Sequence, residues 1–247
     1  MNAVLPHRIL EVIRKDLPET KLFQASSSEV FGDSLAEAQN ENTPLQPQTR
    51  YAVAKAYAHW AVRAYRSRHG VYACSGILFN HESPRRPLVY VSQKIATAAA
   101  LISLGLASSG ERDELGRPIL IDGQLSLGNL DVRRDFGFAG DHVKAMWLML
   151  QQDRADDYVI GTGETHSIVD ICAVAFSHVG RDWRSHVVVD PKLVRQVDSH
   201  YTRADIAKAR VTLGWQPSRS FEELIRMMVD ARVAALLARQ EKRVAIS

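Results

Sequence analysis

A tyrosine and a lysine lie four residues apart in the segment Tyr51-Ala-Val-Ala-Lys55. Residues at this spacing project from the same face of a helix. An ammonium group close to a phenol favours the phenolate, and a phenolate can take a proton from a hydroxyl group while hydride leaves the same carbon. Taken alone the pair says little, because many helices carry Tyr and Lys four apart by chance.

A polar segment, Ser26-Ser27-Ser28-Glu29, directly follows residues 21–25, Lys-Leu-Phe-Gln-Ala, which we interpret as a short buried strand. In open α/β sheets the ligand crevice lies beyond the carboxyl ends of the strands. Serine hydroxyls there can bind a sugar oxygen, and a carboxylate can move a proton. The alternative is a serine-capped turn. This segment lies some twenty residues before Tyr51, which favours a site that uses both the segment and the Tyr51–Lys55 pair.

Alternating helices and strands would position these groups. Helical spacing of apolar residues predicts helices over residues 4–16, 51–69, 90–106, 139–152, 167–179, 203–213 and 220–239. Short apolar runs predict strands at 21–25, 71–79, 119–121, 125–127, 158–160 and 187–189, with loops at 32–50, 80–88 and 108–118. This alternation predicts an α/β fold with a doubly wound, mainly parallel sheet.

A sheet of this kind normally opens with a strand and a Gly-rich turn that holds a pyrophosphate. This sequence opens in a helix, and its one Gly-x-Gly, Gly161-Thr162-Gly163, lacks the third glycine, so we interpret it as a tight turn. We therefore expect a Rossmann-like domain that is incomplete at its N-terminus, by about 100 residues. Residues 1–80 would form its later part. Residues 81–247 would form mainly a smaller substrate-binding region, with some segments returning to the first domain.

The composition, 247 residues with 46% hydrophobic and 24% charged residues, describes a soluble globular protein. The net charge is +3 and the basic residues are dispersed, which argues against a nucleic-acid surface. Cys74 and Cys172 are isolated, as expected of buried free thiols in a reducing compartment, and no metal-ligand spacing occurs. The absence of a leader and of an eighteen-residue apolar stretch predicts a cytoplasmic protein with no membrane partner.

Three stretches carry a resemblance to a known family. They are FQASSSEVFG at residues 23–32, YAVAK at 51–55 and GILFNHESPRR at 76–86. Together they resemble the GDP-mannose 4,6-dehydratases, which are extended short-chain dehydrogenase/reductases. The block from Asn80 to Arg86 is the most specific part. Further similar stretches lie at 127–137, 157–163 and 208–215, so the resemblance spans about residues 4–230.

The resemblance implies a catalytic set of four residues. Tyr51 would take the proton of the sugar 4-hydroxyl, and Lys55 would hold the nicotinamide ribose and tune Tyr51. Glu29 would remove the C5 proton and help to expel the C6 hydroxyl as water. Ser27, where the family usually has Thr, would hydrogen-bond the 4-oxygen.

The resemblance also implies a set of binding residues. NADP would be bound by Tyr51, Lys55, His81 and Arg86, and the substrate GDP-mannose by Asn80, Lys94, Arg134, Arg195 and Asp198. Lys94 and Arg134 match positions near the nucleotide diphosphate. Arg195 and Asp198 align with a family stretch, Arg-Pro-x-Glu, that binds phosphate and ribose. This sequence differs from that stretch at Gln196 and Asp198. No metal is implied, and the family resemblance predicts a homo-oligomer, a dimer or tetramer.

The activity implied is that of a lyase in deoxysugar nucleotide metabolism. GDP-mannose would be oxidised at C4, lose water and be reduced at C6, with NADP restored at the end of each cycle. One alternative is another nucleotide-sugar dehydratase or epimerase, although Glu29 disfavours simple epimerases, which need no proton acceptor at C5. The other is a non-catalytic nucleotide-sugar-binding module, favoured by the missing glycine turn.

Overall fold

The computed structural model describes residues 2–113, 115–194 and 201–244, with side chains described as far as residue 241. The chain divides into two compact units, which are interleaved in sequence. The first unit comprises Met1–His81, Arg134–Thr165 and Val197–Ser218. The second comprises Glu82–Arg133, His166–Gln196 and Arg219–Ser247.

The first unit contains a parallel sheet with the strand order β1-β2-β8. Its strands are β1 (Leu22–Ser27), β2 (Ala73–Leu78) and β8 (Asp157–Ile160), and its helices are α1 (Val4–Asp16), α2 (Arg50–His69), α4 (Ala139–Leu150) and α6 (Ala207–Leu213). Shorter elements are the 3-10 turn η1 (Ser28–Phe31) and strand β7 (Phe136–Phe138). Strands β3 (Asn80–Glu82) and β6 (Arg133–Arg134) contribute Asn80, His81 and Arg134 to this unit, and their other residues belong to the second. Helix α2 provides the crossover that parallel pairing of β1 with β2 requires.

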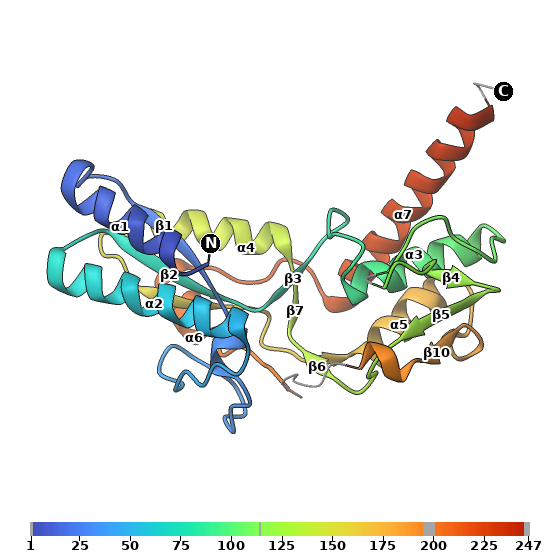
Figure 1. Cartoon of the computed structure of the whole chain (residues 1–247), viewed down its shortest axis with the longest axis horizontal. Coiled ribbons are helices and arrows are strands. Elements are labelled where there is room, and N and C mark those ends of the chain that lie inside the picture. Colours follow the sequence, from blue (N-terminus) through green and yellow to red (C-terminus); the bar gives the residue numbers. More distant parts are fainter. Residues whose placement is uncertain (1, 114, 195–200, 245–247) are drawn as a thin grey trace. The chain divides into compact units, whose positions relative to one another are not determined.

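Helices cover both faces of this sheet, as a doubly wound fold requires (Figure 1). Ala73 and Cys74 are adjacent in β2, so their side chains point to opposite faces. Ala73 joins a buried cluster with Leu10 of α1 and Val62 of α2. Cys74 joins a second buried cluster that includes Met149 of α4. The predicted α/β fold with a parallel sheet is confirmed.

Local capping determines where the long helix α2 begins and ends. The Thr49 side chain accepts a hydrogen bond of 3.0 Å from the backbone N–H of Ala52. At the other end Gly70 adopts a left-handed conformation with φ 67°, which glycine tolerates without a steric cost. Helix α2 therefore starts one residue before Tyr51, which places that side chain in the first turn.

The second unit is built around the almost fully buried helix α3 (Val91–Ser103), which packs against α5 (Ile168–His178) and α7 (Phe221–Val244). A small sheet has the order β10-β5-β4, formed by Val187–Val189, Gln124–Leu127 and Leu120–Ile121. Strand β10 pairs parallel to β5, and β4 pairs antiparallel to it. Strand β9 (His166–Ser167) and the 3-10 turns η2 (Trp183–Ser185) and η3 (Pro191–Leu193) complete the unit.

All seven predicted helices are present, but four short strands were not predicted. Strand β3 lies where a loop was expected, and β6, β7 and β9 lie in segments without strand periodicity. Strands of two or three residues are too short for an alternating pattern. Helix α6 also starts later than predicted, at Ala207, and α7 runs further, to Val244.

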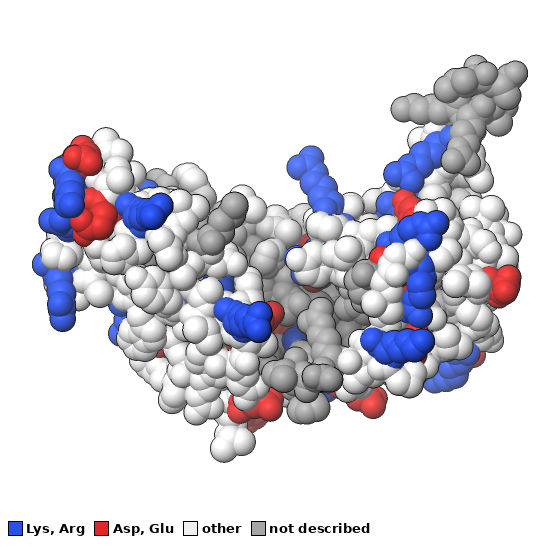
Figure 2. Space-filling model, viewed as in Figure 1, with Lys and Arg blue, Asp and Glu red and all other residues white. Residues whose placement is uncertain are grey.

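The charged surface agrees with the dispersed basic residues of the sequence. On the face shown in Figure 2, Lys and Arg side chains form separate small groups, several of them beside acidic side chains. None of the helices in the described parts of the chain is long and apolar enough to span a membrane.

Candidate active site

The first turns of α2 and the carboxyl end of β1 bring the predicted Tyr and Lys together. The Lys55 ammonium donates a hydrogen bond of 2.9 Å to the carbonyl oxygen of Ala25 in β1. The same Nζ atom lies 5.6 Å from the centroid of the Tyr51 ring. Lys55 thus lies between the strand end and the tyrosine; the four-residue spacing predicts its closeness to Tyr51, and the contact with β1 comes from the fold.

The electrostatic setting of this pair suits proton transfer. Tyr51 is 43% exposed, so a ligand can reach its hydroxyl. It lies near the N-terminus of α2, where the helix dipole favours negative charge. Partial burial lowers the pKa of the Lys55 ammonium, while the Ala25 carbonyl gives that ammonium a hydrogen-bond partner.

Ser27 and Glu29 lie where β1 passes into η1. The Ser27 hydroxyl oxygen accepts a bond of 3.3 Å from the backbone N–H of Glu29, so the serine does cap a turn. This capping leaves the hydroxyl hydrogen available as a donor, because only the oxygen is engaged. Glu29 is exposed, whereas Val30 and Phe31 after it are buried and anchor the turn.

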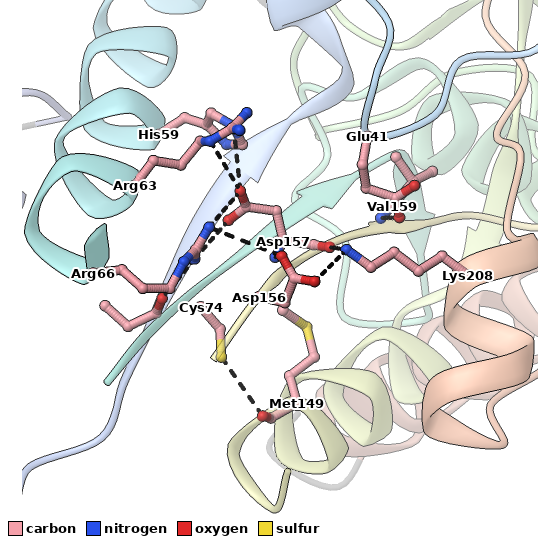
Figure 3. A network of polar contacts seen from close by, with 11 residues as sticks. Glu41, His59, Arg63, Arg66, Cys74, Met149, Asp156, Asp157, Val159 and Lys208 are labelled. Carbon is pink, nitrogen blue, oxygen red and sulfur yellow. Dashed lines mark hydrogen bonds and ion pairs between the residues drawn. The ribbon is translucent and has the colours of Figure 1, made fainter. Parts of the chain in front are cut away.

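An ion-pair network that the sequence analysis missed anchors the other end of α2 (Figure 3). Arg66 makes two hydrogen bonds, of 3.0 and 2.8 Å, to the Asp157 carboxylate at the start of β8. Arg66 also donates to the Ala73 carbonyl of β2, at 2.8 Å. His59 and Arg63 approach the same carboxylate at 3.9 and 3.6 Å. Helix α2 is therefore tied to two strands of the sheet.

A second buried acid, Asp135, organises the Gly161–Gly163 segment. Its carboxylate accepts bonds from the backbone N–H groups of Thr162, Gly163 and Ala204 and from the Thr162 hydroxyl, at 2.7 to 3.1 Å. Burial raises the pKa of Asp135, and these hydrogen bonds oppose that rise. The segment is a tight turn around a carboxylate, as predicted. Little in the sequence signals this buried acid, because Asp135 directly follows two arginines.

Strand β3 carries two of the predicted binding residues, Asn80 and His81. Both are half-buried. The Nδ1 atom of His81 lies 2.9 Å from the carbonyl oxygen of Phe79, and its ring lies 4.9 Å from the ring of His142 on α4. Arg134 of β6 belongs to the same unit and is also half-buried.

The second unit holds Arg86 in a fixed position. The Nε atom of Arg86 lies 3.2 Å from the Glu82 carboxylate, and its guanidinium lies 3.5 Å from the centroid of the Tyr90 ring. Glu82 is buried and also accepts a hydrogen bond of 2.5 Å from the Ser92 hydroxyl. This arrangement gives the guanidinium one defined orientation.

Lys94 lies on α3 and is only 4% exposed. It lines a small pocket of about 30 Å³ together with Asp113, Arg117, Gln124, Ser126 and four apolar residues. Arg117 also pairs with Asp190, at 2.6 Å. The predicted residues Arg195 and Asp198 lie outside the described residues. Within the parts of the chain that the structure describes, no group of three or more His, Cys, Asp or Glu side chains could hold a metal ion.

A family model described as GDP-mannose 4,6 dehydratase matches residues 1–228. The chain belongs to the GDP-mannose 4,6-dehydratase family. Every predicted site residue falls within the matched region, including Arg195 and Asp198.

Named members of the family are similar over most of this chain. GDP-mannose 4,6 dehydratase 1 of Arabidopsis thaliana is 43% identical over 239 residues, which cover 95% of this chain and 61% of the relative. The human GDP-mannose 4,6 dehydratase is 38% identical, with 92% of this chain and 62% of the relative covered. This chain thus spans about three fifths of the length of these two relatives.

Solved structures share the fold at low sequence identity. RMD from Pseudomonas aeruginosa, complexed with NADPH, superposes with a TM-score of 0.80 at 20% identity, covering 95% of this chain and 74% of that one. A dTDP-glucose 4,6-dehydratase from Bacillus anthracis, in complex with NAD, superposes with a TM-score of 0.77 at 21% identity, covering 93% and 67%. These similarities establish a Rossmann-type fold for this member of the family.

Proposed function

We propose that this chain carries the catalytic residues of a GDP-mannose 4,6-dehydratase, a hydro-lyase of deoxysugar nucleotide biosynthesis. The product would be GDP-4-keto-6-deoxymannose. The observation that carries the proposal is the Lys55 ammonium, hydrogen-bonded to Ala25 and adjacent to Tyr51, in a chain of this family. Oxidising the sugar at C4 requires a base beside a cation, which this pair supplies.

Each residue at the β1 end has a defined task in this proposal. Tyr51 takes the proton of the 4-hydroxyl, and the Lys55 ammonium stabilises the phenolate that Tyr51 must supply. The Ser27 hydroxyl donates to the 4-oxygen, which it can do while its own oxygen accepts the Glu29 N–H. A ketone at C4 makes the C5 proton acidic, so Glu29 can remove it and return a proton to the C6 hydroxyl as it leaves as water.

We propose NADP as the cofactor, with Tyr51, Lys55, His81 and Arg86 as its binding residues. When bound, the nicotinamide would accept a hydride from C4 and return it to C6, while the proton held by Tyr51 would be passed back to C5, restoring the phenolate. The residues present fit such a group at its nicotinamide end, because Tyr51 is exposed beside an anchored Lys55. The oriented guanidinium of Arg86 suits a phosphate or carboxylate partner.

For the nucleotide end of GDP-mannose we propose Asn80, Lys94, Arg134, Arg195 and Asp198. The buried ammonium of Lys94 and the half-buried guanidinium of Arg134 support this proposal, since a diphosphate pairs with cations of this kind.

The function can be tested in a chimera in which the N-terminal part of the Arabidopsis relative precedes this chain. It should convert GDP-mannose to a 4-keto-6-deoxy sugar without net formation of NADPH. The Glu29→Gln variant should still oxidise C4 but stall before the loss of water, so that the absorbance of reduced nicotinamide builds up. Glu37→Gln, which removes an exposed carboxylate paired with Arg203, is the matched control.

Two outcomes would reject parts of this proposal. Wild-type turnover by the Glu29→Gln chimera would exclude Glu29 as the C5 base. Activity on another nucleotide sugar, with none on GDP-mannose, would favour the alternative of a different dehydratase or epimerase.

We also propose that the chain forms a homodimer through α1 and α2. Large apolar side chains recur at i, i+4 and i+7 on both helices and are 39–54% exposed: Leu5, Ile9 and Val12 on α1, and Val53, Tyr57 and Trp60 on α2. The two helices pack side by side (Figure 1), and we infer that these exposed side chains form one apolar face. A second copy would bury that face.

The oligomeric state can be measured by light scattering on two matched variants. Trp60→Glu should convert the dimer to a monomer, because it places a charge in the apolar face. Trp147→Glu, which alters a tryptophan of similar exposure on α4, should leave the dimer intact. A Trp60→Glu variant that remained dimeric would exclude this face.

A cytoplasmic location is also proposed, in keeping with the two buried free thiols, Cys74 and Cys172.

A further inference from the structure

Two histidines of the first unit, His81 just after the end of β2 and His142 on α4, lie against each other. His81 is in β3, which pairs with β7, and β7 leads directly into α4, which carries His142. The two ring centroids are 4.9 Å apart and the ring planes are inclined by 34°. His142 is not among the predicted site residues.

His142 is held in one orientation. It is 1% exposed, and its Nδ1 atom lies 3.1 Å from the carbonyl oxygen of Phe138. A Cβ atom at Gly137 would come within 2.8 Å of the His142 Cε1 atom, so the ring occupies space that glycine leaves open. The Trp215 ring meets it edge-on, with centroids 6.5 Å apart. Burial, reinforced by His81, lowers the pKa of His142 to about 3.

The hydrogen bonds determine which nitrogen of each ring carries the proton. A carbonyl oxygen only accepts hydrogen bonds, so Nδ1 must be the protonated nitrogen in both rings. A neutral imidazole with a proton on Nδ1 has a bare Nε2 that can only accept. For His142 this Nε2 is buried, and the ring also meets the backbone of Ile160, whose contact opposes the fall in its pKa. For His81, which is half-buried, it remains the one ring nitrogen available to a ligand.

We propose that His142 is a positioning residue that holds His81 in the Nδ1–H form, so that His81 Nε2 accepts a hydrogen bond from a neutral donor of the bound dinucleotide. The packed, uncharged ring of His142 fixes the orientation of His81 and prevents it from turning its other nitrogen towards Phe79. The recognised group is therefore an amide N–H or a hydroxyl, not a phosphate. This inference rests on the proposed function only for the identity of the ligand.

The arrangement of protons can be tested without any ligand. In ¹⁵N-labelled wild-type chain, long-range ¹H–¹⁵N spectra should show His81 with a protonated Nδ1 and a bare Nε2. A neutral histidine in water prefers the tautomer with its proton on Nε2, so a proton on Nδ1 would indicate that the fold selects this form. A protonated Nε2 on neutral His81 would overturn the proposal, and this measurement needs no variant that could fail to fold.

A variant tests the part played by His142. His142→Phe keeps an aromatic ring but loses the bond to Phe138, and it should shift His81 towards a mixture of both forms. His186→Phe is the matched control. The Nδ1 atom of His186 also lies near a carbonyl oxygen, 3.0 Å from that of Gly123, and its ring stacks on Phe176. The control should leave the His81 signals unchanged. An unaltered His81 spectrum in His142→Phe would show that His142 has no positioning role.

Ligand recognition is tested by titrating the wild-type chain separately with NADP⁺ and with inorganic phosphate. NADP⁺ should move the His81 Nε2 resonance, and phosphate should not. His142→Phe should raise the NADP⁺ dissociation constant about five-fold, the loss of one neutral hydrogen bond. If phosphate moved Nε2 as far as NADP⁺ does, the donor assignment would be wrong. If NADP⁺ did not bind at all while the Nδ1–H form was present, the proposed cofactor would fail but the histidine arrangement would stand.

Discussion

The Lys55 ammonium donates a hydrogen bond of 2.9 Å to the carbonyl oxygen of Ala25, and this bond joins the helix that carries Tyr51 to the strand that leads to Glu29. Gln24 also donates to the same oxygen, at 2.9 Å. The carbonyl therefore keeps a partner when Lys55 is replaced. The lysine can be altered to test its chemistry with little effect on the fold.

Lys55→Met in the chimera described above should lower turnover at least about 100-fold, because Tyr51 loses the cation that favours its phenolate. The free energy of unfolding should fall by only about 1 kcal/mol. Lys21→Met is the matched control, since Lys21 makes the same type of bond, 2.9 Å to the Leu150 carbonyl, away from Tyr51. Equal turnover in the two variants, by product assay, would remove Lys55 from the catalytic set.

Arg134→Ala should weaken GDP binding by about 1.5–3 kcal/mol, the range for a charged hydrogen bond. Arg133→Ala is its natural comparison, because successive residues of β6 point to opposite faces and Arg133 lies 3.8 Å from the Asp170 carboxylate. Calorimetry should therefore separate the two variants. An unchanged dissociation constant for Arg134→Ala would exclude it from the nucleotide site. Arg195→Ala is expected to behave as Arg134→Ala does.

Arg66→Met should reduce the free energy of unfolding by about 3 kcal/mol, because it leaves the buried Asp157 carboxylate without its two-bond partner. Arg63 and His59 remain near that carboxylate and keep the loss from being larger. Arg68→Met changes an exposed arginine in the same last turn and should alter stability by less than about 0.5 kcal/mol. Urea unfolding of both variants measures the difference, and similar midpoints would contradict the anchoring role.

Asp135→Asn should also destabilise the protein, by about 3 kcal/mol, since an amide nitrogen would face N–H groups that now donate to a carboxylate. Asp131→Asn, at an exposed position nearby in sequence, should have little effect. Thermal unfolding distinguishes the two. A wild-type melting temperature for Asp135→Asn would mean that the turn at Gly161–Gly163 does not depend on this charge.

The buried His142 predicts loss of stability in acid. Its pKa falls from 6.5 to about 3 in the folded state, so between these values the unfolded chain binds one more proton than the folded chain. The contribution of neutral His142 to the free energy of unfolding is fully present above pH 6.5 and is lost as the pH falls from 6.5 towards 3. Between pH 7.5 and 5 the loss should be about 2 kcal/mol.

His142→Phe removes this titration. Between pH 7.5 and 5 the free energy of unfolding of the variant should therefore fall by about 2 kcal/mol less than that of the wild type. Urea unfolding of wild type and variant at both pH values gives the comparison. His59, whose pKa burial also lowers, contributes equally to both proteins and cancels. Parallel pH profiles for the two proteins would show that His142 is not buried in its neutral form.

The sequence by itself predicted the α/β class, all seven helices and the adjacency of Tyr51 and Lys55. These features depend on interactions within a few residues: the helical period, the Thr49 cap and the glycine stop at Gly70. A helix brings residues four apart together wherever it is placed, so their proximity needs no knowledge of the fold. The family resemblance likewise rests on local stretches of sequence.

Only the tertiary structure decided which distant groups meet. Arg66 reaches Asp157 across 91 positions of sequence, and His81 meets His142 only because β3 pairs with β7. Strands as short as β3 and β7 have no periodic signal, and their pairing is stable only when surrounding packing holds them. The state of a buried ionisable group depends on everything packed around it. For Asp135 and His142, that environment is assembled from segments far apart in the chain.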